Sequence, residues 1–220
     1  MLQNFFDNVF VITTVNSPRI SYIKQHLESH NIKFEFIVAP NYNIIRKDIN
    51  VIHNTIHNNS RASISLTSTY VSILHQSKLN SLNTIAIIED DCFLTGDWKE
   101  KFLDFYTHIP SDWDILNLGY HPIHDVEDCK INLNKFVSIP TKNYYTTHFT
   151  VIKSSCFDLY VDLSEIFKYK LPADCLFIEL YDKVKSFVPN EKFAYQLSLR
   201  ENQEEFEIPN APKHRFSSFI

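Results

Sequence analysis

An apolar run that ends in three carboxylates constrains the fold of this chain more than any other feature. Residues 84–88 are apolar or β-branched, and Glu89, Asp90 and Asp91 follow at once. A run of roughly 4–8 such residues is typical of a strand that is buried on both faces of a sheet. Open α/β sheets bind their ligands at the carboxyl ends of such strands. The stretch therefore predicts an α/β fold with an acidic site at one edge of its sheet.

Three adjacent negative charges repel one another, and holding them near a core is costly unless a positive charge lies among them. Clustered carboxylate oxygens suit a hard divalent cation, Mg²⁺ or Mn²⁺. On an extended segment the side chains of Glu89 and Asp91 point the same way and that of Asp90 points the opposite way. We therefore expect Asp91 as a direct metal ligand and Glu89 on the metal, on its waters or on the ribose of a nucleotide donor. The alternative is a solvated acidic turn that closes a core strand.

The rest of the chain continues the α/β pattern. Residues 9–15 and 33–38 are predicted strands, and the amphipathic helix between them completes a βαβ unit. Further helices are predicted at residues 63–78, 98–107, 154–167 and 172–181, and further strands at residues 113–119, 136–139, 144–152 and 187–188. Loops are predicted at residues 39–61 and 125–134. We expect one domain over residues 1–220, with a mostly parallel Rossmann-like sheet, helices on both faces and a surface-wrapping tail at about residues 201–220.

Composition excludes several classes of function. The 220 residues include only 2 glycines, so neither the dinucleotide-binding fingerprint nor the P-loop can be present. The net charge of −5 and the scattered Lys and Arg residues argue against nucleic acid as a partner. The 4 cysteines form no CxxC pair, which favours free thiols in a reducing compartment. No signal peptide or transmembrane segment is recognisable, so we expect a cytoplasmic protein, either free or peripheral to a membrane through its acceptor.

Several segments, in this order, resemble glycosyltransferase family 25, the lipopolysaccharide-type glycosyltransferases that also include the collagen galactosyltransferases. Residues 87–91 are similar to the acidic metal motif of that family almost letter for letter. The other segments are Arg19 after the first strand and residues 31–37, 65–69, 113–119, 172–174 and 195–198. The chain departs from the family at Ser65 and Thr69, where a Cys and a His are usual, so it resembles a divergent member.

The resemblance implies a GT-A fold and a metal-dependent hexosyltransferase. Such an enzyme would move galactose or glucose from a UDP-sugar to a hydroxyl group of a glycan, lipid or protein, with Mn²⁺ or Mg²⁺ as cofactor. The resemblance also implies roles for single residues. Asp91 and Glu89 would hold the metal together with His214, and Asp174 would be the general base of an inverting transfer. The expected donor-binding residues are Thr13, Arg19, Ser68, Glu89, Asp90 and Gln196.

Plainer explanations compete with these roles. Arg19 would also fit a helix surface, Asp174 a helix N-terminus and His214 an exposed basic tail. His148 lies in a β-prone stretch and is expected to be a packed histidine. At the level of function, two alternatives stay open. One is a catalytically degenerate protein that binds sugar nucleotides, and the other is a metal-dependent nucleotidyl or phosphoryl transferase.

Overall fold

The computed structural model describes residues 2–40, 60–119, 129–145, 147–168 and 171–197 of the chain. The predicted tail and His214 lie outside these residues, as does most of the loop predicted at residues 39–61.

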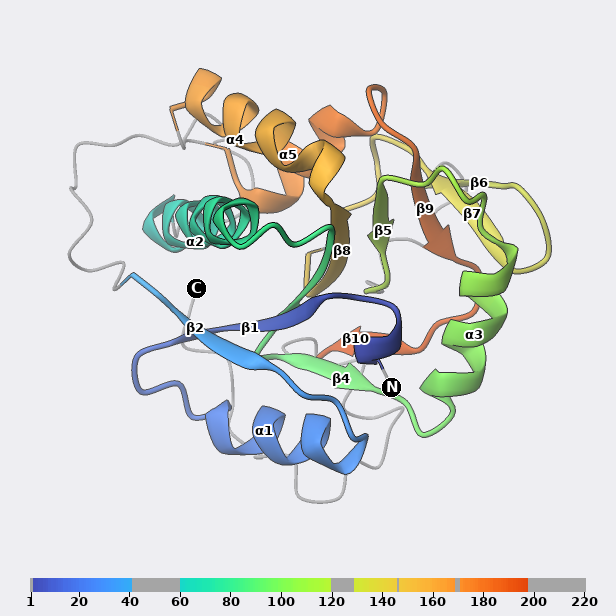
Figure 1. Ribbon diagram of the computed structural model, residues 1–220, viewed down its shortest axis with the longest axis horizontal. Helices are drawn as coiled ribbons and strands as arrows, with labels where there is room; N and C mark the ends of the chain where they lie inside the picture. Colours follow the sequence, from blue (N-terminus) through green and yellow to red (C-terminus); the bar gives the residue numbers. More distant parts are fainter. Residues whose placement is uncertain (1, 41–59, 120–128, 146, 169–170, 198–220) are drawn as a thin grey trace.

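An eight-stranded sheet forms the centre of the molecule (Figure 1). Its strand order is β2-β1-β3-β8-β5-β9-β7-β6. The strands are β1 (Asn8–Thr14), β2 (Glu35–Ala39), β3 (Thr84–Glu89), β5 (Ile115–Asn117), β6 (Lys130–Asn132), β7 (Val137–Pro140), β8 (Phe149–Lys153) and β9 (Ser186–Pro189). Strands β7 and β8 run against their neighbours, so the other six strands share one direction. The sheet is therefore mixed and mostly parallel, as the sequence predicted.

Helices cover both faces of this sheet, and each face has its own hydrophobic core (Figure 1). One core lies under α2 (Ser60–Leu79), α4 (Phe157–Ile166) and α5 (Ala173–Leu180). The other lies under α1 (Ile20–Ser29), α3 (Trp98–His108) and the short 3-10 helix η1 (Leu2–Asn4). A second 3-10 helix, η3 (Ser154–Cys156), leads into α4. Side chains of β3 alternate between the two cores, which explains why its sequence is apolar throughout.

A second, two-stranded sheet lies beside the carboxyl end of β3 and was not predicted. It pairs β4 (Cys92–Leu94) with β10 (Ala194–Gln196) in antiparallel register, Phe93 opposite Tyr195. Both strands are three residues long, too short for a period-2 pattern to indicate them. This small sheet brings a distant segment of the chain against the acidic turn.

Two predictions about the region of residues 125–152 need correction. Residues 130–132 belong to β6 and not to a loop, because Ile131 pairs with Ile139 across the hairpin. The strand predicted at residues 144–152 begins only at Phe149. The Tyr144 amide instead donates to the Thr141 carbonyl, and the Tyr144 hydroxyl donates to the Gly119 carbonyl at 3.1 Å. These bonds turn the chain away from the sheet before β8 begins.

No helix in the described part of the chain combines the length and the apolar composition that a bilayer crossing requires.

Helix α1 is attached to β4 through a histidine side chain. The Leu94 amide donates to Nε2 of His26 at 2.9 Å, and the His26 ring stacks on both Tyr22 and Phe93. Burial, with a smaller effect of His30, lowers the pKa of His26 to about 4. His26 is therefore a neutral hydrogen-bond acceptor in the folded protein.

This arrangement predicts a loss of stability in acid. Between about pH 6.5 and pH 4 the unfolded chain binds a proton at His26 and the folded chain does not, so the free energy of unfolding falls by roughly 2–3 kcal/mol over that interval. The variant His26→Gln offers an amide oxygen at the same place and cannot titrate. Urea unfolding at several pH values should give a shallower decline for His26→Gln than for the wild type; equal slopes would contradict the assignment.

Candidate functional site

Glu89 is the last residue of β3, and Asp90 and Asp91 form the turn to β4. Three separate segments hold the backbone of these three acids, which together we call the acidic turn. The Glu89 amide donates to the His148 carbonyl at 3.0 Å, and the Asp90 amide donates to the Ile12 carbonyl of β1 at 3.0 Å. The Asp91 carbonyl accepts from the Leu197 amide at 2.8 Å. The position of the turn is therefore fixed from β1, from the start of β8 and from the end of β10.

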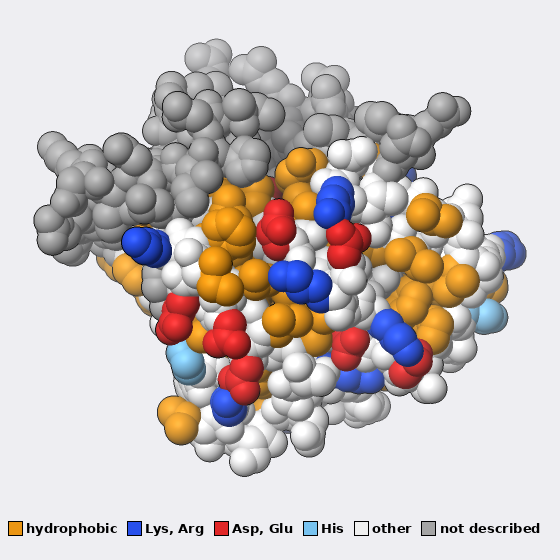
Figure 2. All heavy atoms as spheres, turned by 90° about the horizontal axis from the view of Figure 1, so that it is seen from above, with side chains coloured by type: hydrophobic (Ala, Val, Ile, Leu, Met, Phe, Trp, Pro, Cys, Tyr) orange, Lys and Arg blue, Asp and Glu red, His pale blue; other side chains and the backbone are white. Residues whose placement is uncertain are grey.

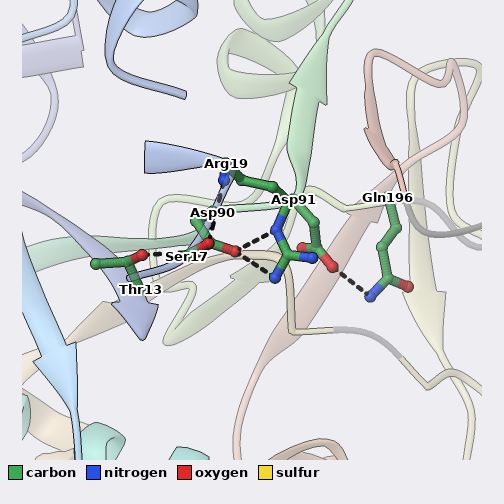
Figure 3. A network of polar contacts seen from close by, with 6 residues as sticks. All are labelled: Thr13, Ser17, Arg19, Asp90, Asp91 and Gln196. Atoms are coloured by element: carbon green, nitrogen blue, oxygen red, sulfur yellow. Dashed lines mark hydrogen bonds and ion pairs between the residues drawn. The ribbon is translucent and has the colours of Figure 1, made fainter. Parts of the chain in front are cut away.

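Asp90 is the paired acid of the three (Figure 3). Thr13 at the end of β1 donates its hydroxyl to Oδ2 of Asp90 at 2.6 Å. Arg19 directs Nε and one terminal nitrogen to Oδ1 of Asp90, each at 2.7 Å. The Asp90 side chain is only 5% exposed, so these charge-assisted bonds replace the water that burial removed.

Asp91 and Glu89 are incompletely satisfied. Oδ2 of Asp91 accepts a hydrogen bond from Nε2 of Gln196 at 3.1 Å (Figure 3). Oδ1 of Asp91 and Oε1 of Glu89 are both buried and have no hydrogen-bond partner among the described residues. Buried carboxylate oxygens without a partner are costly, so their presence in one turn indicates that a ligand belongs there.

The pKa values of Glu89 and Asp91 are both raised, as expected for buried carboxyl groups that each have an unpartnered oxygen. Burial, and then the charge of Asp91, raise the pKa of Glu89 to about 8. Burial also raises the pKa of Asp91, although the positive charge of Arg19 opposes the shift. Burial alone would lower the pKa of Arg19, but the charges of Asp91, Asp90 and Glu89 outweigh it and raise that pKa. One guanidinium thus faces three carboxyl groups, and burial disfavours the charged forms of Glu89 and Asp91; a bound cation would favour those charged forms.

The two unpartnered oxygens could supply part of the coordination shell of a divalent cation. Glu89 and Asp91 offer hard oxygen ligands, the type that Mg²⁺ and Mn²⁺ prefer. Among the residues that the structure describes, no three metal-ligating side chains come together. Mg²⁺ is commonly bound by one or two carboxylates, with substrate phosphates and waters completing its shell. The turn suits that mode of binding, and the predicted third ligand, His214, lies outside the described residues.

The predicted base, Asp174, lies in the first turn of α5 and is half-buried. Its Oδ1 accepts a hydrogen bond from the Cys175 amide at 2.8 Å. Its charge is among the causes that raise the pKa of Glu89, which means that the two carboxyl groups interact. The structure therefore brings Asp174 to the same region as the acidic turn.

Ser68 lies on α2 and is half-buried. Among the described residues, its hydroxyl has no hydrogen bond to the acidic turn. The two neighbouring positions that depart from the family pattern serve α2 itself. The Thr69 hydroxyl donates to the Ser65 carbonyl at 2.7 Å, and the Ser65 hydroxyl donates to the Pro40 carbonyl at 2.6 Å.

Sequence reasoning missed the residues behind Glu89. The Tyr70 hydroxyl, fully buried, donates to the Thr147 carbonyl at 2.8 Å, and the Thr147 side chain opposes the rise that burial causes in the pKa of Glu89. His148 is 2% exposed, as expected for a packed histidine. Its ring lies so close to Gly119 that a Cβ atom there would be 2.5 Å from Nε2 of His148. The sequence carried one sign of this close packing: Gly119 is one of only 2 glycines in the chain, which indicates a position where a side chain does not fit.

The Arg19–Asp90 pair should contribute strongly to stability. Arg19→Ala removes the guanidinium and leaves Asp90 buried and charged, so we expect the free energy of unfolding to fall by about 3 kcal/mol. In the double variant Arg19→Ala/Asp90→Asn the uncompensated charge is gone, and much of the loss should be recovered. Chemical denaturation of the wild type, both single variants and the double variant measures this coupling. Additive effects of the two substitutions would contradict it.

Comparison with known proteins identifies the family of this chain. Residues 6–171, more than half of the chain, match glycosyltransferase family 25 (LPS biosynthesis protein). No curated protein matches the sequence.

Among solved structures, a glycosyltransferase involved in the glycosylation of the major capsid of PBCV-1 aligns with a TM-score of 0.50. The two sequences are 7% identical, and the alignment covers 90% of this chain and 98% of that one. A197 from STIV aligns with a TM-score of 0.42 and 11% identity, covering 82% and 81% of the two chains. Mouse xyloside xylosyltransferase 1 aligns with a TM-score of 0.39 and 9% sequence identity, and the alignment covers 80% of each chain. By its sequence match the chain belongs to glycosyltransferase family 25, and its fold is of the GT-A type.

Proposed function

We propose that this protein transfers a hexose, galactose or glucose, from a UDP-sugar to a hydroxyl group of a glycan, lipid or protein acceptor, and that the transfer depends on Mn²⁺ or Mg²⁺. The observation that carries the proposal is the pair of buried, unpartnered oxygens on Glu89 and Asp91. They lie where β3 ends, at the edge of the sheet where α/β proteins bind their ligands.

Glu89 and Asp91 would hold the cation, and the diphosphate of the donor would complete the coordination. When bound, the cation would act as a Lewis acid on the charge that develops on the departing nucleoside diphosphate. Gln196 fixes one oxygen of Asp91 by its hydrogen bond, which leaves the other oxygen for the metal. His214 remains the proposed third ligand from the protein.

One side of the donor site would be formed by Arg19, Asp90 and Thr13, which are bonded to one another. Nε and a terminal nitrogen of Arg19 already bind Asp90, so contact with the donor would use the remaining N–H groups of the guanidinium. The Arg19 side chain is 20% exposed, which is compatible with such contact. Ser68 is proposed as a weaker contributor from α2.

Asp174 would accept the proton of the acceptor hydroxyl as that oxygen attacks the anomeric carbon. In-line attack on the face opposite the nucleotide inverts the configuration at that carbon. The proton moves to a carboxylate oxygen of Asp174, the new glycosidic bond forms, and the bond to the diphosphate breaks with its electron pair.

Thermal denaturation tests the donor site. With UDP-galactose or UDP-glucose at about 100 times Kd, and with Mn²⁺, the melting temperature of the wild type should rise by roughly 5–10 °C. The rise should vanish without metal and in Asp91→Asn, because the cation joins donor to protein. Asp158→Asn, which alters a surface carboxylate paired with Lys78, is the matched control and should keep the full rise.

The same assay separates the alternatives. If a UDP-sugar raises the melting temperature but the protein neither hydrolyses nor transfers the sugar, the result would favour the degenerate binding protein. A rise only with nucleoside triphosphates would favour the nucleotidyl transferase. A metal-independent rise, or an equal rise in Asp91→Asn, would contradict the proposed site.

Kinetics test the proposed base. Asp174→Asn should lower kcat for transfer by about 10²–10⁴-fold, while the metal-dependent shift with donor stays unchanged, because only proton transfer is lost. Asp162→Asn on α4 replaces an exposed carboxylate and should leave kcat near the wild-type value. Wild-type rates in Asp174→Asn, or a product with retained anomeric configuration by NMR, would exclude this role.

A further inference from the structure

Tyr145 presents the most exposed aromatic ring in the part of the chain that the structure describes. The residue is 40% exposed, and every other described Phe, Tyr and Trp is more buried. A tyrosine offers a wide, rigid contact surface at a low entropic cost, because only two torsions are fixed when it binds. A single exposed apolar side chain needs no explanation on its own, so the groups around Tyr145 decide what its ring can do.

Hydrogen bonds of Tyr144 fix the chain directly before Tyr145. The Tyr144 carbonyl accepts from the Tyr181 hydroxyl at 3.2 Å, and that hydroxyl accepts from Nδ2 of Asn117 at 2.6 Å. Tyr144, Tyr181 and Asn117 are all buried. The backbone that carries the exposed ring is therefore held from β5 and from the end of α5 before any ligand binds, which lowers the entropic cost of binding.

The chain after Tyr145 leads directly to the acidic turn. The Thr147 carbonyl accepts from the buried Tyr70 hydroxyl, and the carbonyl of the next residue, His148, accepts from the Glu89 amide. Tyr145 precedes His148 by three positions, and an extended chain covers at most roughly 3.6 Å per residue. The Cα atom of Tyr145 therefore lies within roughly 11 Å of the Cα atom of His148.

Residues 142–145 run alongside α5. Nζ of Lys142 forms an ion pair with Asp182 at 2.6 Å, just beyond the C-terminal end of the helix. Near the N-terminal end, partial burial, with smaller effects of Cys175 and Asp174, raises the pKa of Tyr145, which means that the Tyr145 hydroxyl interacts with these two side chains. The ring of Tyr145 therefore lies near Asp174, the proposed general base.

Polar side chains accompany the ring along this helix. The exposed ones are Lys142, Asn143, Glu179 and Asp182, and together with Tyr145 we call them the α5 strip. The bond to Asp182, with a smaller effect of Glu179, raises the pKa of Lys142, so these charges act on one another. Figure 2 views the molecule from the side on which α4 and α5 lie in Figure 1, and acidic, basic and hydrophobic side chains are intermingled over the middle of that face. The strip thus combines one aromatic ring with charged and amide groups.

We propose that the ring of Tyr145 stacks on a pyranose ring of the acceptor and that the polar side chains of the α5 strip bind the hydroxyl groups of that sugar. One face of a pyranose presents C–H groups, which pack on an aromatic ring, and its edge carries hydroxyl groups, which bond with carboxylates, amides and ammonium groups. A hydroxyl of the stacked sugar would face Asp174, which accepts its proton. The inference rests on the proposed function and narrows it, because the acceptor is then a saccharide that Tyr145 helps to select.

The uracil of the donor is a poorer partner for Tyr145. In the sheet, β1 lies on one side of β3, whereas β8 and β5 lie on the other. Thr13 and Arg19 belong to the side of β1, and Tyr145 belongs to the side of β8 and β5. With a cation at the acidic turn between them, nucleotide and acceptor would occupy opposite sides. A lipid or peptide acceptor would need a wider apolar surface than one ring.

Saturation-transfer NMR tests the α5 strip without donor or metal. The probes are methyl β-D-galactopyranoside and methyl β-D-glucopyranoside. At least one of them should receive saturation, most strongly on the ring protons of one face, and its affinity should fall roughly tenfold in Tyr145→Ala. Tyr145→Trp keeps an aromatic face and should bind the same sugar at least as tightly as the wild type. The fluorescence of Tyr145→Trp should respond to that sugar, since Trp98 and Trp113 are buried.

The matched control is Leu103→Ala, because Leu103 is also 40% exposed but lies on α3, which covers the opposite face of the sheet. It should keep the wild-type affinity for the glycoside, and circular dichroism and melting temperature establish that each variant is folded. No saturation transfer in the wild type, an undiminished affinity in Tyr145→Ala, or an equal loss in Leu103→Ala would overturn the inference. So would saturation transfer to uridine alone that Tyr145→Ala abolishes, because the ring would then hold the base of the donor.

The thermal assay with donor separates this inference from the proposed function. If a UDP-sugar with Mn²⁺ raises the melting temperature but neither glycoside binds, the inference is wrong and the proposed function stands. If a glycoside binds at Tyr145 but no sugar nucleotide raises the melting temperature, the α5 strip stands as a saccharide site and the transferase proposal fails.

Discussion

The ion pair between Arg19 and Asp90 makes the acidic turn possible. Three adjacent carboxyl groups at the end of a buried strand repel one another, and burial raises the cost of each charge. Arg19 and Thr13 satisfy Asp90 with short bonds, which fixes the turn to β1 and to the start of α1. Glu89 and Asp91 are left with one unpartnered oxygen each among the described residues. The pair therefore stabilises the fold and leaves two acids available for a cation.

The rest of the structure supports that turn from several directions. β1 contributes Thr13 and the Ile12 carbonyl, the segment before β8 contributes Thr147 and His148, and β10 contributes Gln196. These groups come from positions far apart in the sequence, and the mixed central sheet together with the β4–β10 pair brings them to the acidic turn. A site held by rigid elements in this way keeps its geometry before the ligand arrives, which favours binding and catalysis.

Sequence alone predicted the elements better than their assembly. The buried pattern of β1 and β3, the acids at the end of β3 and the long helix α2 all follow from local periodicity. Gln196 was expected at the site, and the structure brings it to Asp91. The antiparallel placement of β8 between β3 and β5 was not predictable, nor was the pairing of β4 with β10. Both depend on contacts across long sequence separations, and strands of three residues carry no recognisable pattern. The bond from Arg19 to Asp90 spans 71 positions and escaped notice for the same reason.

The central claim is that Glu89 and Asp91 together bind the cation that the sugar nucleotide requires. Electron paramagnetic resonance of free Mn²⁺, titrated against the protein in the presence of UDP, tests it most directly because it counts bound metal without needing an acceptor. We predict one saturable Mn²⁺ site in the wild type, a loss of that site in Glu89→Gln/Asp91→Asn, and an unchanged site in the surface variant Asp112→Asn. Stoichiometric binding that persists in the double variant, or no binding in the wild type, would contradict the claim.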